Sequence, residues 1–235
     1  MKFTGKVALV TGGSRGIGLA AAQALTKAGA NVMICGRSGK DVDRQVGVLN
    51  SMWQGRIAGL ACDISDEYSV RHLIEHTTHT FGGIDILVNN AGVGLLGPVE
   101  TFSPADWRAT LDINLTGAFY CCHFIIPKMK ARGGGHIINI ASRSSINAYA
   151  GGAAYCASKF GLLGLSEALN LELRRDNIRV SCILPGPVAT DFAGESPQDW
   201  HLSTEDVAEA ILDVLAFHPR ALASRIELRP ARPPS

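Results

Sequence analysis

The sequence predicts an α/β protein built on one doubly wound parallel sheet of about seven strands, with helices on both faces. Short apolar runs alternate along the chain with longer segments of helical periodicity, and this alternation is typical of parallel sheets. The chain has 235 residues, the length of one large α/β domain. Hydrophobic residues make up 46% of it and charged residues only 18%, so a sizeable core can form.

Each predicted strand is a short apolar run bounded by turn residues. The predicted strands cover residues 7–10, 31–35, 57–62, 84–88, 136–140, 178–184 and 225–228. A helical segment follows each of the first six, so the connections are right-handed crossovers. We find no linker and predict one domain over residues 1–235, in which residues 229–235, with three prolines, form a loose tail.

Capping residues mark the ends of the predicted helices. Gly29 is a C-terminal stop, and Ser103 with Pro104 is an N-cap followed by a proline in the first turn. The acidic stretch Ser65-Asp66-Glu67 favours a helix start, because carboxylates stabilise the positive end of the helix dipole. The predicted helices cover residues 16–28, 40–52, 65–81, 103–130 with a bend near 117, 154–174 and 203–217.

Composition excludes several classes of partner. The net charge of +1 argues against nucleic acid or an anionic membrane surface. The sequence shows no run of 18 apolar residues and no signal peptide, so we predict no membrane span. The six cysteines form no C-x-x-C pair, which predicts reduced thiols and a cytoplasmic location. His72, His76 and His79 share a polar helix face, and we predict no metal site.

The stretch KVALVTGGSRGIG, residues 6–18, joins a buried strand to a helix through a glycine-rich turn. Free N–H groups and partial positive charge at such a helix start bind anions, and glycines let a phosphate approach the backbone. The spacing of Gly12, Gly16 and Gly18 is G-x-x-x-G-x-G. On its own this pattern also fits a plain strand-to-helix turn without a ligand.

Two arginines predict which dinucleotide binds. After the second strand the chain has Gly36-Arg37, where a carboxylate would accept hydrogen bonds from a ribose diol. Arg37 and Arg15 together suit a 2′-phosphate, so we predict NADP(H) rather than NAD(H). The alternative is that both are solvated surface arginines. Asp63, after the third strand, is either an acceptor for an adenine amino group or a helix cap.

Asparagines follow the fourth strand and interrupt a later helix. In Asn89-Asn90-Ala91-Gly92 the amides can tie strand ends together, and the small pair leaves room for a flat ligand. Asn114 lies in the middle of a helical stretch, where asparagine is unfavourable. Something other than helix propensity can hold it there, and the alternative is an ordinary polar residue on a solvated face.

A tyrosine, a lysine and a serine point to acid–base chemistry. Tyr155 and Lys159 are four residues apart and share one helical face. A lysine ammonium favours the phenolate, so we expect the Tyr155 pKa to be lowered from about 10 toward neutrality. Such a tyrosine can donate a proton to a carbonyl oxygen, and Ser142, at the end of the fifth strand, can hydrogen-bond the same oxygen.

Taken together and in this order, these motifs resemble the single-domain short-chain dehydrogenase/reductase family, with its Rossmann-type sheet. The matching segments are TGGSRGIG (11–18), NNAG (89–92), Asn114, Ser142, YCASK (155–159) and PGPVAT (185–190). The resemblance implies a catalytic tetrad. Tyr155 is the general acid/base, Ser142 polarises the carbonyl, Lys159 holds the nicotinamide ribose, and Asn114 holds a water in a proton relay.

The resemblance also implies a set of cofactor-binding residues along the carboxyl edge of the sheet. They are Gly12, Ser14, Arg15, Gly16, Ile17, Gly18, Arg37, Asp63, Ile64, Asn90, Ala91, Gly92, Tyr155, Lys159, Pro185, Gly186, Val188 and Thr190.

The function that the resemblance implies is NADPH-dependent reduction of a keto group to a secondary alcohol. The chain is most similar in character to 3-oxoacyl-[acyl-carrier-protein] reductases, which implies a small-molecule or carrier-bound carbonyl substrate. The alternatives are a carbonyl, pterin or sugar reductase, or an NADP-binding regulatory protein without catalysis.

The segment between Thr190 and Ser203 is shorter than the family's usual lid, which predicts an open cleft. We expect its lining to include Leu95, Leu96, Tyr149, Phe192 and Trp200. The helices within 118–130 and 154–174 predict a homodimer, with a homotetramer as the alternative.

Overall fold

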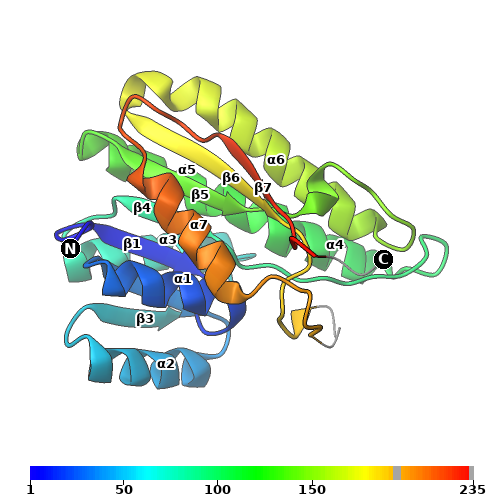
Figure 1. The fold of residues 1–235 in the computed structure, drawn as a ribbon, viewed down its shortest axis with the longest axis horizontal. Coiled ribbons are helices and arrows are strands. Elements are labelled where there is room, and N and C mark those ends of the chain that lie inside the picture. The colour runs from blue at the N-terminus through cyan, green and yellow to red at the C-terminus, as the bar shows by residue number, and fades with distance from the viewer. Residues whose placement is uncertain (193–196, 233–235) are drawn as a thin grey trace.

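The computed structural model describes residues 1–192 and 197–232, and a seven-stranded sheet lies at its centre. The strand order is β3-β2-β1-β4-β5-β6-β7 and every neighbouring pair is parallel (Figure 1). The predicted fold class is therefore confirmed. The strands are β1 Val7–Thr11, β2 Asn31–Gly36, β3 Ile57–Ala61, β4 Ile86–Asn89, β5 Gly135–Ile140, β6 Ile178–Pro185 and β7 Arg225–Leu228.

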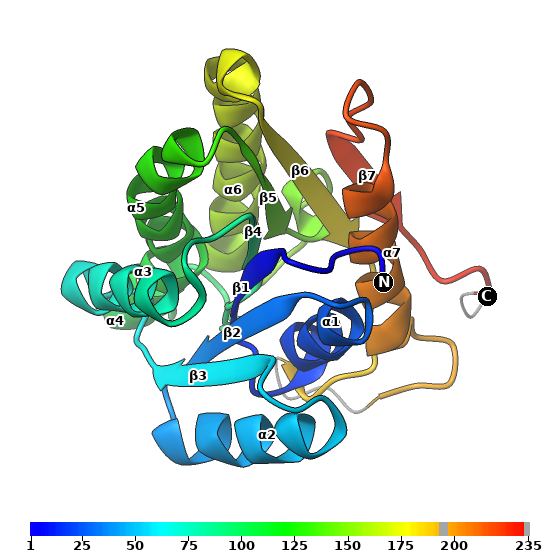
Figure 2. The same ribbon diagram turned by 90° about the vertical axis from the view of Figure 1, so that its left-hand side faces the viewer.

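Helices cover both faces of the sheet (Figure 2). One face packs α1, α2 and α7 against side chains such as Val10 and Ile138, and the other packs α3, α5 and α6 against Leu9 and Ile137. Alternate residues of a strand point to opposite faces, so each buried strand feeds both layers. The helices are α1 Gly16–Lys27, α2 Gly39–Met52, α3 Glu67–Phe81, α4 Pro104–Leu111, α5 Gly117–Ala131, α6 Ala153–Leu173 and α7 Thr204–Ala216.

Side-chain caps set where most of these helices begin. Ser38 caps α2, Ser103 caps α4, and Ser203 forms a capping box with Asp206 at α7. Helix α3 begins two residues later than predicted because Asp66 is its cap and accepts from the Ser69 N–H over 3.0 Å.

The predicted helix over residues 103–130 is interrupted by a π-helical turn, Asp112–Thr116, between α4 and α5. The bend expected near Gly117 is this turn. A Cβ on Gly117 would lie 2.8 Å from the carbonyl oxygen of Ile64, so α5 packs directly on the loop after β3. The stretch Pro104–Ala131 has the length and the hydropathy, 1.2, that a membrane span requires, but in the fold its helix α5 covers the sheet.

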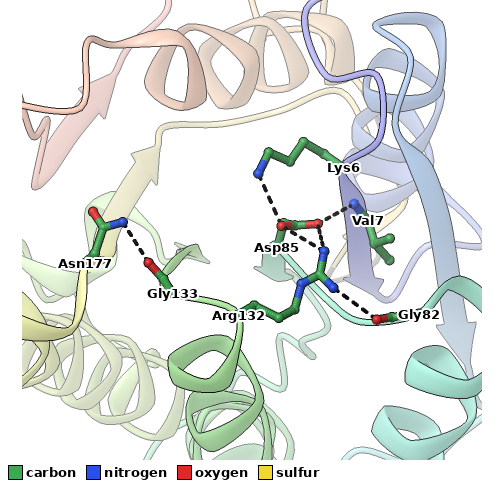
Figure 3. A network of polar contacts seen from close by, with 7 residues as sticks. All are labelled: Lys6, Val7, Gly82, Asp85, Arg132, Gly133 and Asn177. Atoms are coloured by element: carbon green, nitrogen blue, oxygen red, sulfur yellow. Dashed lines mark hydrogen bonds and ion pairs between the residues drawn. The ribbon is translucent and has the colours of Figure 1, made fainter.

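At the amino edge of the sheet, Asp85 joins three segments of the chain (Figure 3). Its carboxylate accepts from the backbone N–H of Val7 over 2.9 Å, from Lys6 Nζ over 3.2 Å and from an Arg132 guanidinium nitrogen over 3.3 Å. Arg132 also donates to the carbonyl of Gly82 over 3.0 Å. These contacts hold β1, β4 and the end of α5 together at the edge opposite the predicted site.

A buried histidine in β5 makes the fold sensitive to acid. His136 is 3% exposed, its Nε2 lies 2.8 Å from Ser181 Oγ, and its Nδ1 has no hydrogen-bond partner among the described residues. Burial, with a smaller contribution from the charge of Arg179, lowers its pKa from 6.5 to about 3. The unfolded chain therefore binds a proton between these two pH values that the folded chain does not.

We expect the free energy of unfolding to decrease as the pH falls from 6.5 toward 3, because protonation of His136 favours the unfolded state. His136→Gln keeps a partner for Ser181 but does not titrate, so its stability should fall less steeply. Urea denaturation at several pH values measures the free energy of unfolding of the wild-type protein and of His136→Gln. If this free energy falls with pH equally steeply in the two proteins, the result would contradict the role of His136.

Candidate active site

A cavity of about 430 Å³ opens at the carboxyl edge of the sheet, where parallel α/β folds bind ligands. Of the predicted site residues, all except Gly18 and Asn114 line it. They are Gly12, Ser14, Arg15, Gly16, Ile17, Arg37, Asp63, Ile64, Asn90, Ala91, Gly92, Ser142, Tyr155, Lys159, Pro185, Gly186, Val188 and Thr190.

The glycine turn forms one wall of the cavity. Gly12 has φ +63°, a conformation that L side chains rarely adopt. Helix α1 begins at Gly16, and its N-cap, Arg15, makes no side-chain cap hydrogen bond. A Cβ on Gly18 would lie 2.2 Å from the carbonyl oxygen of Gly12. Gly18 therefore allows α1 to pack on the turn and does not line the cavity.

The two predicted phosphate-binding arginines differ in their contacts. Arg15 forms a salt bridge with Asp191 in the loop after β6. Arg37 is exposed at the end of β2 and forms no salt bridge within the described part of the chain. Next to it, a Cβ on Gly36 would lie 3.1 Å from Ser14 Oγ. Among the described residues that line this end of the cavity, Arg37 is thus the cation without a salt bridge.

Asp63 lies on the cavity wall and is not the helix cap. Its Oδ1 accepts from the backbone N–H of Ser65 over 3.0 Å and from Ser65 Oγ over 2.7 Å. These hydrogen bonds lower the Asp63 pKa, with a further contribution from the positive charge of Arg37. Asp66 caps α3 instead, which leaves the second oxygen of Asp63 available at the cavity.

The asparagines after β4 tie strand ends together, as expected. Asn90 donates its amide to the carbonyl of Thr11 over 2.9 Å, and Asn89 donates to Asn139 Oδ1 over 2.9 Å. These bonds join β4 to β1 on one side and to β5 on the other. The cavity floor is therefore held in one geometry at the point where the strand order reverses.

Asn114 lies behind the cavity wall, in the π-helical turn. It is 1% exposed, its amide donates to the Val93 carbonyl over 2.9 Å and to Ser158 Oγ over 3.0 Å, and its Oδ1 accepts from the Val93 N–H over 2.8 Å. A π turn inside a helix often marks a functional site. These tertiary bonds explain an asparagine that helix propensity disfavours.

Ser142, Tyr155 and Lys159 meet at the other end of the cavity. Ser142 hydrogen-bonds the Tyr155 phenol. Lys159 is 4% exposed, its Nζ donates to the Ile140 carbonyl over 2.9 Å, and it lies 5.7 Å from the centre of the Tyr155 ring. A Cβ on Gly92 would lie 3.7 Å from Lys159 Nζ and 3.2 Å from Asn114 Oδ1, so both side chains flank the same glycine.

The expected depression of the Tyr155 pKa is wrong for the free protein. Burial raises this pKa to about 12, although a hydrogen bond between Tyr155 and Ser142 opposes the rise. Burial also lowers the Lys159 pKa to about 8. The Tyr155 ring is so deeply buried that desolvation is the largest influence on the pKa of its phenol. At neutral pH the phenol is protonated, which is the state that a proton donor needs.

The sequence and the fold both resemble those of known proteins. The sequence pattern of short chain dehydrogenases matches residues 6–200. The chain belongs to the short-chain dehydrogenase/reductase family. It is an oxidoreductase by this membership, and the family prediction is confirmed.

Three relatives illustrate the similarity of this short-chain dehydrogenase/reductase to known proteins. A D-threitol dehydrogenase of Mycolicibacterium smegmatis is 40% identical over 191 residues, which cover 81% of this chain and 73% of that protein. A 3alpha-hydroxysteroid dehydrogenase of Mediterraneibacter gnavus is 36% identical over 84% of this chain and 80% of its own. A metagenomic short-chain oxidoreductase, crystallised with NADP, has a TM-score of 0.88 and 34% identity, and the alignment covers 99% and 100% of the two chains.

The substrate end of this short-chain dehydrogenase/reductase includes residues that sequence reasoning missed. Leu96, Tyr149 and Phe192 line the cavity as expected, whereas Leu95 and Trp200 do not. Part of the predicted short lid, residues 193–196, lies outside the described residues. Cys62 also lines the cavity and was not predicted, whereas Arg143, Ser144 and His201 lie in the loops 143–152 and 191–201, which we expected to line it. Ser144 is two residues beyond Ser142, and this spacing was the available signal.

Proposed function

We propose that this enzyme uses NADPH to reduce a ketone to a secondary alcohol. The observation that carries the proposal is the arrangement of one cavity, with Ser142, Tyr155 and Lys159 at one end and the glycine turn and Arg37 at the other. The cavity thereby combines hydrogen-bond donors for a carbonyl oxygen with a binding site for a phosphorylated dinucleotide. Oxidation of NADPH in the presence of a panel of ketones at pH 7 tests this function.

The residues of the cavity fit NADP(H). The uncapped start of α1 offers N–H groups to a pyrophosphate, because its N-cap uses no side chain. Gly36 stands where a carboxylate would repel a 2′-phosphate, and Arg37 beside it offers a guanidinium with no salt bridge among the described residues. On the facing wall, Thr190 Cγ2 would lie 3.5 Å from a Cβ on Gly16, so the segment after β6 closes over the turn.

The nicotinamide, when bound, supplies the hydride that is transferred to the carbonyl carbon. Ser142 donates a hydrogen bond to the carbonyl oxygen, and Tyr155 gives that oxygen its phenolic proton. The buried Lys159 ammonium orients the ribose and stabilises the phenolate that remains. Asn114 uses its side chain to hold Val93 and Ser158, so the water that we assign to it is bound through its backbone carbonyl.

The substrate proposal includes the narrower class that the sequence suggested, a 3-oxoacyl thioester on acyl-carrier protein. Support comes from Leu96 and Phe192, which give the substrate end apolar walls beside the hydroxyl donors. A small free ketone fits the same donors. Reduction of an acetoacetyl thioester alongside ketones without a thioester separates the two.

We further propose that residues 1–235 act as one domain and that two chains form a homodimer through α5 and α6. Phe119 on α5 and Phe160 and Leu171 on α6 are 45%, 46% and 65% exposed, and exposed apolar surface of this kind marks interfaces. Six free buried cysteines support a cytoplasmic location. Sedimentation equilibrium tests the dimer, and a monomer at micromolar concentration would contradict it.

A further inference from the structure

Two serine hydroxyls lie side by side at the substrate end of the cavity. Ser142 Oγ donates to Ser144 Oγ over 3.1 Å, and the backbone N–H of Ser144 donates back to Ser142 Oγ, also over 3.1 Å. Both residues are half-buried and both line the cavity. The assigned donor to the carbonyl is therefore one member of a pair.

The local backbone holds the pair in place. Ser142 is the N-cap of a single 3₁₀ turn, Arg143–Ser145, which packs beside the start of α6. Arg143 donates its Nε to Glu227 on β7 over 3.0 Å, which anchors the turn to the sheet. Two oxygens on so short a turn keep their separation, so a ligand meets them as a fixed arrangement.

A hydroxyl has one proton and two lone pairs, and this inventory determines what the pair can bind. The Ser144 N–H occupies one lone pair of Ser142, and the Ser142 proton is directed at Ser144 in the free protein. When Ser142 donates to a substrate carbonyl instead, the Ser144 hydroxyl can donate to the second lone pair of Ser142, and the lone pairs of Ser144 are then open to a hydrogen-bond donor. Within the described part of the chain Ser142 is the one side-chain partner of Ser144, so a hydroxyl on the substrate can supply the donor that Ser144 accepts from.

Resting on the proposed ketone reduction, we infer that Ser144 binds a hydroxyl on the carbon next to the substrate carbonyl, and that the preferred substrates are α-hydroxy ketones. Oxygens on neighbouring carbons can lie a hydrogen-bond distance apart, as the two serine oxygens do. A ketone with a bare α-carbon offers Ser144 no such donor. Loss of such a pairing reduces kcat/KM by about 10- to 100-fold.

The test compares 3-hydroxybutan-2-one with butan-2-one, which differ only in the α-hydroxyl. The wild-type enzyme with NADPH should prefer the hydroxy ketone by about 10- to 100-fold in kcat/KM. Ser144→Ala should lose this preference by lowering kcat/KM for the hydroxy ketone alone, and Ser144→Thr, which keeps the hydroxyl, should retain it. Thermal unfolding of each variant checks the fold.

Ser145→Ala is the matched control. Ser145 lies in the same turn, but its Oγ is buried and has no hydrogen-bond partner among the described residues, so its loss should leave the preference unchanged. An equal loss for both ketones in Ser144→Ala would show that Ser144 only orients Ser142, and would overturn the inference. Equal reduction of both ketones by the wild-type enzyme would also overturn it. Reduction of no ketone at all would refute the proposed function, and the inference with it.

Discussion

Tyr155→Phe is expected to lower kcat for ketone reduction by about 10²- to 10⁴-fold, the contribution of a positioned proton donor. The change removes one oxygen and keeps the ring, which packs against Phe192 with ring centres 5.7 Å apart. The dissociation constant for NADPH should stay nearly unchanged, because no cofactor phosphate contacts the phenol in the proposed arrangement. Steady-state kinetics and NADPH fluorescence titration measure the two quantities.

Tyr68→Phe is the control for loss of a phenol elsewhere, since Tyr68 is 75% exposed on α3 and far from the cavity lining. Its activity should equal that of the wild-type enzyme. Activity within a few-fold of wild type in Tyr155→Phe would remove Tyr155 from the mechanism. A parallel loss of NADPH binding would instead point to a disturbed fold.

Arg37→Asp is expected to raise KM for NADPH by about 10- to 100-fold, because a charge-assisted contact to a phosphate contributes about 1.5–3 kcal/mol. KM for NADH should fall or stay constant, since a carboxylate at this position accepts from a ribose diol. Arg15→Ala should have a smaller effect. In the free protein Arg15 is paired with Asp191, and that salt bridge must break before Arg15 can bind a phosphate.

Arg44→Asp makes the same change of charge on α2, where Arg44 pairs with Asp41 and does not line the cavity. It should leave the NADPH preference intact. Equal KM values for NADH and NADPH in the wild-type enzyme would refute the phosphate role of Arg37. An unchanged preference in Arg37→Asp would do the same.

Local pattern predicted most of the fold, because strands and helices here have strong signals of their own. Gly29 and Ser103-Pro104 end and begin helices through backbone chemistry that depends on few neighbours. The start of α3 was placed too early because two acidic residues, Asp63 and Asp66, compete for the cap. Only the hydrogen bonds show that Asp66 caps the helix and Asp63 forms a turn with Ser65.

The site was predictable as a set of residues and less so as chemistry. Tyr155 and Lys159 share a helical face by spacing alone, but the depth of their burial does not follow from spacing, and burial raises the tyrosine pKa to about 12. The close contact of Gly18 with the Gly12 carbonyl oxygen is likewise a property of packing. Ser144 was not singled out within its loop because a spacing of two residues does not by itself show that a 3₁₀ turn brings its hydroxyl to Ser142.

The central claim is that hydride passes from NADPH to a carbonyl carbon in the cavity next to Tyr155. Reduction of 3-hydroxybutan-2-one with NADPH dideuterated at nicotinamide C4 tests it directly, with mass spectrometry and NMR of the product. We predict one deuterium on the newly formed carbinol carbon of each product molecule. Alcohol without deuterium at that carbon would contradict the account.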